Sequence, residues 1–89
     1  MSTQETINSA DTSVRDNLVE FVSKSTKTEV APDLDIFASG LVSSLFAMQL
    51  VVHLESAFGI TIGGADLKLD NFRTIDAMTT LVQRLRDGG

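Results

Sequence analysis

The stretch GLVSSL at residues 40–45 lies between an acidic loop and an apolar helical run that ends at Gly59. Within it, Ser44 places a hydroxyl at the predicted start of a helix, with no basic side chain beside it. Free backbone N–H groups and the positive end of the helix dipole favour a phosphate at such a position. Serine is also a preferred helix cap, so the same pattern fits a residue that only starts the helix. The hydroxyl is better suited to being modified than to attacking a substrate.

Helical periodicity extends over most of the 89 residues, which suffice for one small core. We expect a flexible tail at residues 1–8 and a single domain at residues 9–87. Helices are predicted over about 9–25, 43–58 and 71–86, with a single short turn of helix at 65–69. A long loop that contains Pro32 joins the first two helices. The predicted fold is all-α, a four-helix bundle with a long first loop and a short third helix.

The predicted helix ends depend on a few capping residues. Ser9 or Asp11 is expected to cap the first helix, and Asn71 or Thr74 the last. The second helix is expected to end at Gly59, because glycine tolerates the left-handed conformation at a helix C-terminus.

The second helix is apolar over more than one face. Leu50 and Leu54 belong to a stripe that is predicted to face the core, whereas Leu45, Met48 and Val52 extend apolar character to a second face. In so small a domain, part of this apolar arc is left exposed and favours a surface for partner docking. The alternative is that a neighbouring loop covers it.

The net charge of −5 is concentrated in the middle of the chain. No lysine or arginine lies between Lys27 and Lys68, and this segment contains Glu29, Asp33, Asp35, Glu55 and Asp66. Such a one-sign surface attracts partners with basic patches and repels nucleic acid. A general contribution to solubility is the other interpretation.

The chain lacks the residues that several classes of protein function require. The chain has no cysteine, which favours a reducing cytoplasm, and no signal peptide or membrane span is predicted. His53 is the only histidine, has no convincing set of metal ligands around it, and is expected to be a surface or boundary residue. Val42 and Phe46 occupy the glycine places of a hydrolase serine motif around Ser44. We therefore expect neither an enzyme nor a metal site.

The chain resembles the acyl and peptidyl carrier protein family over almost the whole domain. The order of short motifs carries the resemblance: LDIFASGLV at residues 34–42, Ser44-Leu45, Gln49-Leu50, Leu54-Glu55 and Phe58-Gly59-Ile60. The resemblance implies an acyl-carrier-like bundle in which Ser44 is the attachment site of 4'-phosphopantetheine. In that family a separate phosphopantetheinyl transferase transfers this arm from coenzyme A with Mg²⁺. The terminal thiol of the arm then carries an acyl group as a thioester.

The resemblance also implies the partners. Leu45, Met48 and Val52 match partner-facing positions, and with Ser43 and Glu55 they form the expected partner-binding set. The expected partners are acyl-loading enzymes and enzymes of the ketosynthase or acyltransferase type with basic docking patches. The expected protein is a cytoplasmic monomer that binds neither nucleic acid nor membranes.

One departure concerns Ser43, because the family usually has aspartate before the modified serine. The chain could be a natural variant that is still modified, an engineered or degenerate carrier, or a carrier modified at Ser43; Leu45 favours the register at Ser44. The chain looks most like a freestanding carrier of polyketide or mixed polyketide and nonribosomal-peptide antibiotic biosynthesis, with a substituted malonyl unit as cargo. The competing hypothesis is a helical adaptor module that is never modified.

Overall fold

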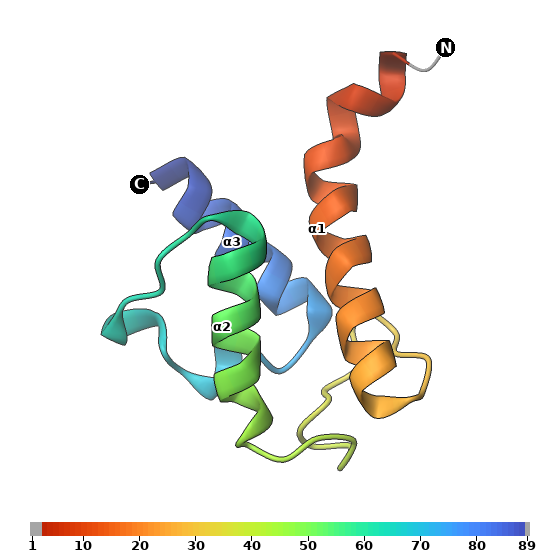
Figure 1. Cartoon of the computed structure of the whole chain (residues 1–89), viewed down its shortest axis with the longest axis vertical. Helices are drawn as coiled ribbons and strands as arrows, with labels where there is room; N and C mark the ends of the chain where they lie inside the picture. Colours follow the sequence, from red (N-terminus) through yellow and green to blue (C-terminus); the bar gives the residue numbers. More distant parts are fainter. Residues whose placement is uncertain (1–2, 89) are drawn as a thin grey trace.

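The computed structural model describes the backbone of residues 3–88 and the side chains of residues 13–87. Its α-helices are α1 (Thr3–Thr26), α2 (Phe46–Phe58) and α3 (Ile75–Gly88), and two short 3₁₀ helices, η1 (Gly64–Asp66) and η2 (Leu69–Asn71), connect α2 to α3. Residues 3–88 contain no strand. The all-helical class is confirmed, but the four-helix count is wrong. The arrangement of the three α-helices is consistent with the acyl-carrier-like fold that the resemblance implies (Figure 1).

The missing helix has a local cause in the segment between Gly63 and Asn71. Lys68 has an extended backbone (φ −123°, ψ 140°) and separates η1 from η2. The side-chain amide of Asn71 donates to the carbonyl oxygen of Asp66 at 2.8 Å, so a side chain occupies an acceptor that a continuous α-helix would use internally. The short helix predicted at residues 65–69 is therefore replaced by two 3₁₀ turns.

The helix ends agree with the predictions at two positions. Gly59 ends α2 in the left-handed conformation (φ 65°), and its N–H donates to the carbonyl oxygen of Glu55. Thr74 caps α3, because its Oγ1 accepts the N–H of Ala77 at 2.9 Å. The predicted cap of α1 at Ser9 or Asp11 is wrong, since both residues lie within a helix that begins at Thr3.

The core is formed where the inner stripes of the three helices meet the long loop. α1 and α3 pack against each other, and α2 lies beside them (Figure 1). The inward-facing stripe predicted for the second helix is confirmed, because Leu50 and Leu54 are both buried. The buried apolar residues are Val14, Leu18, Val22, Val30, Ile36, Leu50, Leu54, Ile60, Ile62, Phe72, Ile75, Met78, Leu81 and Val82. No described helix is both long enough and apolar enough to cross a bilayer.

Candidate functional site

The loop that leads to Ser44 is held in place by Asp35. One carboxylate oxygen accepts the N–H groups of Phe37 at 3.0 Å and Ala38 at 2.8 Å, and the other lies 3.1 Å from the Arg73 guanidinium. The N–H of Ile36 donates to the carbonyl oxygen of Arg73 at 2.9 Å, beside this ion pair. The loop is thereby attached to the segment that precedes α3. This attachment positions the chain that runs on through Gly40, whose φ of +83° favours glycine, to Ser44.

Asp35 also predicts how stability depends on pH. The hydrogen bond from the Ala38 N–H, together with those from Arg73 and the Phe37 N–H, holds the pKa of Asp35 below its ordinary value of 3.8, although burial opposes this shift. A carboxyl whose pKa is lowered on folding stabilises the fold above the unfolded pKa, and this contribution is lost as the pH falls through the folded value. We expect Asp35→Asn to lower the urea midpoint near neutral pH, and we expect the difference from the wild type to shrink below about pH 3.8.

The measurement is a series of urea unfolding curves, followed by circular dichroism, across the acid range. Asp33→Asn is the matched control, because this neighbouring residue is exposed. A difference between the wild type and Asp35→Asn that stays constant with pH would show that the ionised carboxylate does not hold the loop.

Ser44 itself is exposed and lies in the turn immediately before α2. The predicted start of this helix at Ser43 is wrong by three residues, because residues 43–45 form a tighter turn. In it the N–H groups of Phe46, Ala47 and Met48 donate to carbonyl oxygens three residues earlier. No serine side chain caps α2. These three amides are therefore not free for a phosphate, and the electrostatic preference that remains is that of the helix dipole.

The expected partner-binding residues differ in their exposure. Leu45, Met48 and Val52 have relative exposures of 77%, 70% and 65%, so no described loop covers them. We call these three residues the α2 face. Ser43 is exposed beside it. Glu55 differs, since it is only partly exposed and its Oε2 accepts the N–H of Ile62 at 2.8 Å, which holds the connection after α2. A role for these residues in partner binding stays a prediction.

A groove beside Ser44 lies between α2 and the segment that connects η1 to α3. It has a volume of about 200 Å³, and we call it the Ser44 groove. Its lining residues are Ser44, Ala47, Met48, Val51, Leu67, Lys68, Leu69 and Phe72. The wall of the groove that the η1–η2 segment contributes was not predicted from the sequence. The alternation of Leu67, Lys68 and Leu69 after two glycines could have indicated an apolar segment outside a helix.

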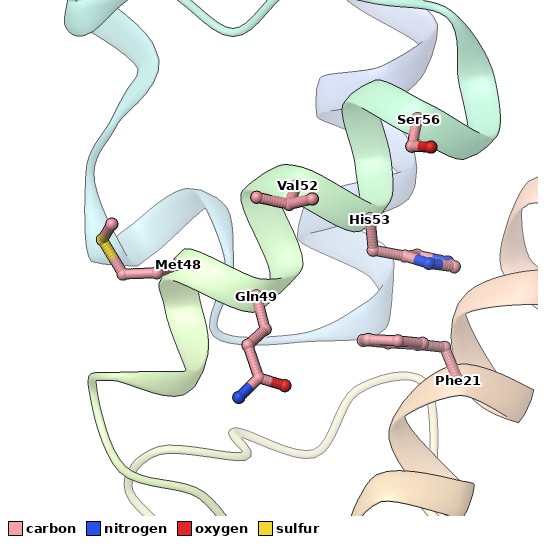
Figure 2. A pocket seen from close by; sticks show the side chains of 6 residues that line it. All are labelled: Phe21, Met48, Gln49, Val52, His53 and Ser56. Carbon is pink, nitrogen blue, oxygen red and sulfur yellow. The ribbon is translucent and has the colours of Figure 1, made fainter.

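A larger hollow of about 500 Å³ lies between α2 and α1; it shares Met48 with the Ser44 groove but does not include Ser44. Figure 2 shows Phe21 of α1 opposite His53 of α2. The two rings stack with centroids 3.9 Å apart, and His53 Nε2 lies 2.6 Å from Asn17 Oδ1. Burial lowers the pKa of His53. The expectation that His53 is a boundary residue is confirmed, since it packs between the two helices.

The acidic segment is less negative than the sequence suggests. Asp35 is paired with Arg73, and Asp66 lies 2.8 Å from a guanidinium nitrogen of Arg84. Both arginines come from outside the segment. Part of its charge is therefore compensated within the molecule, and attraction of basic partners must depend mainly on the remaining carboxylates.

Comparison with known proteins adds the family. The family model described as "Phosphopantetheine attachment site" matches residues 12–82, which include the exposed serine and the helices around it. The chain belongs to this family. It is a non-catalytic carrier, and its cofactor is covalently attached 4'-phosphopantetheine. Carriers of this kind work with a phosphopantetheinyl transferase and with loading or biosynthetic enzymes.

Curated relatives of this carrier align with most of its length at low sequence identity. A D-alanyl carrier protein of Lactococcus lactis is 28% identical over 71 residues, which cover 80% of this chain and 90% of the relative. A D-alanyl carrier protein of Listeria innocua is 25% identical over 75 residues, covering 81% and 96% of the two chains. One from Bacillus velezensis is 31% identical over 55 residues, covering 62% and 70%. None of the solved structures matches the chain significantly.

Proposed function

We propose that this carrier holds an acyl unit as a thioester on a 4'-phosphopantetheine arm attached to Ser44. The main support is the position of this residue: its side chain is exposed in the turn before α2, at the edge of the Ser44 groove and directly before Leu45 of the α2 face. A transferase can reach such a hydroxyl without unfolding the domain, and enzymes that dock on the α2 face then meet the arm beside their contact surface.

The residues present fit the proposed attachment. On modification, Ser44 Oγ forms a bond to the phosphorus next to the pantetheine of coenzyme A, the diphosphate P–O bond breaks, and the nucleotide leaves as 3',5'-adenosine bisphosphate. The hydroxyl proton passes to a base outside this chain, because the described groove around Ser44 contains no carboxylate or histidine. The arm supplies the thiol that a chain without cysteine lacks.

The pathway we propose is assembly of a polyketide or a mixed polyketide and nonribosomal peptide, with a substituted malonyl group as cargo. It follows from the motifs around Ser44 and from an α2 that contains only one acidic residue, Glu55. A second candidate is a D-alanyl cargo, which is favoured by the names of the curated relatives. The partners would be loading and ketosynthase or acyltransferase-type enzymes with basic docking patches.

The test is the intact mass after incubation with coenzyme A, Mg²⁺ and a broad-specificity phosphopantetheinyl transferase, followed by mapping of the modified peptide. We expect the mass of one phosphopantetheine on Ser44. No gain in mass would favour the competing adaptor module, and a gain on Ser43 would move the attachment by one residue.

Docking on the α2 face gives a second prediction. We expect Met48→Glu to slow acyl transfer to or from a partner enzyme about tenfold, because a charge would replace an exposed apolar contact at the centre of the face. The fold should persist, since 70% of the Met48 side chain is already exposed. The measurement is kcat/KM of transfer together with the circular dichroism spectrum.

The matched control is Thr80→Glu, which adds the same charge at an exposed position of α3. An equal loss of kcat/KM in both variants would indicate a general effect of charge rather than docking at Met48. A large loss of helicity in Met48→Glu would contradict its place on the surface.

A further inference from the structure

Lys68 is the only charged residue among those that line the Ser44 groove. Its side chain is exposed between η1 and η2, and the remaining wall is largely apolar. Among the side chains of residues 13–87, no carboxylate lies within ion-pair distance of its ammonium group. The groove therefore combines an apolar surface with one positive charge.

The nearby acidic residues are paired elsewhere. Asp66 lies 2.8 Å from Arg84, and Asp70 lies 2.7 Å from Arg73, so the acidic residues two positions before and after Lys68 each have an arginine partner. These pairings leave Lys68 without a counter-ion from its own segment. An unpaired cation at the edge of an apolar groove attracts an anion that can place an apolar part against the wall.

The dimensions and the chemistry of the groove restrict that anion. Its volume of about 200 Å³ is below the roughly 300 Å³ at which ordinary ligand pockets begin, so it suits a short chain. Burial of a phosphodiester against Leu67, Leu69 and Val51 would cost its hydration without replacing it by hydrogen bonds. A short acyl chain with a carboxylate at its far end reduces that cost, because its uncharged part can lie against the wall while the carboxylate stays hydrated beside Lys68.

We propose that Lys68 binds a carboxylate at the end of a short acyl group that the arm places against the Ser44 groove, so that the carrier favours acyl units with a second carboxyl group. This inference rests on the proposed function, since it requires the arm on Ser44. The interaction is non-covalent. An acyl unit with an ammonium group, such as D-alanyl, would be repelled by the same lysine.

The test uses the whole chain, loaded enzymatically with malonyl-, propionyl- or D-alanyl-pantetheine from the corresponding coenzyme A thioesters. NMR then compares the signals of Leu67, Lys68 and Leu69 with those of the unacylated holo-protein. We expect the largest shift of the Lys68 side-chain signals with malonyl, a smaller one with propionyl, and the smallest with D-alanyl.

A carboxyl-labelled malonyl group tests the ion pair directly. Its acid dissociation constant, followed by ¹³C NMR, should be about two- to fivefold larger in the wild type than in Lys68→Gln, which is the range of an exposed ion pair. Lys27→Gln removes another exposed lysine, which lies outside the groove, and should leave the constant unchanged.

Three results would overturn the inference. The first is a dissociation constant that is the same in the wild type and Lys68→Gln. The second is a full shift of the Lys68 signals between the unmodified protein and the unacylated holo-protein, which would assign the phosphodiester as the partner of Lys68. The third is a larger shift with D-alanyl than with malonyl. Failure of Ser44 to accept any arm would overturn the proposed function and this inference together, whereas loading followed by one of these three results overturns the inference alone.

Discussion

Ser44→Ala is expected to abolish loading with phosphopantetheine, reducing the mass gain to zero under conditions in which the wild type is fully converted. The hydroxyl is the only group that can form the proposed phosphate ester at this position, and alanine removes it without introducing bulk. Because Ser44 is exposed and its side chain does not cap α2, the variant should fold normally. The measurement is intact mass spectrometry, with circular dichroism to confirm the fold.

The neighbouring serine provides the control. Ser43→Ala should still be loaded, because Ser43 is exposed in the same turn and is only a contact in the proposed complex with the transferase. Ser43→Asp should raise the loading rate if the transferase recognises a negative charge immediately before the modified serine. Loading of Ser44→Ala combined with no loading of Ser43→Ala would contradict the proposed register.

Leu54→Ala is expected to have the largest effect on stability. Leu54 is fully buried in α2, and its truncation removes apolar surface and leaves a cavity against the core. Substitutions of this kind cost about 2–5 kcal/mol of the free energy of unfolding, a large share of the roughly 5–15 kcal/mol typical of native proteins. Urea unfolding followed by circular dichroism measures this difference.

Val52→Ala on the same helix separates burial from helix propensity. Val52 is 65% exposed, so its truncation should change the free energy of unfolding by less than about 0.5 kcal/mol. If both variants lost a similar amount of the free energy of unfolding, Leu54 would not face the core. The assignment of the α2 face to solvent would then also be wrong.

The prediction of α2 was accurate in orientation and inaccurate at its start. Helical spacing separates Leu50 and Leu54 from Met48 and Val52, and the structure buries the first pair and exposes the second. The start was misplaced because Ser43 and Ser44 are good caps in any sequence, whereas the tight turn before Phe46 depends on how the preceding loop is attached. The attachment of that loop involves Asp35 and Arg73, which are 38 residues apart.

The sequence by itself determined the helical class and the end of α2 at Gly59, and it narrowed the cap of α3 to Asn71 or Thr74. It also indicated a second apolar face on α2, without excluding a loop that covers it. These features depend on periodicity and on residues a few positions apart, so local patterns are sufficient to predict them. It also singled out Ser44 as the residue to modify, through the order of the motifs around it.

Only the tertiary structure decided the wall of the Ser44 groove and the charges around it. Arg84 pairs with Asp66, which is 18 positions away in the sequence. Residues of α2 line the same groove as residues of the η1–η2 segment, although the turn at Gly63 lies between α2 and that segment in the sequence. Whether Lys68 has a counter-ion depends on which carboxylates the arginines of other elements occupy. Such choices follow from long-range packing, because a side chain pairs with the nearest suitable partner in space and not in sequence.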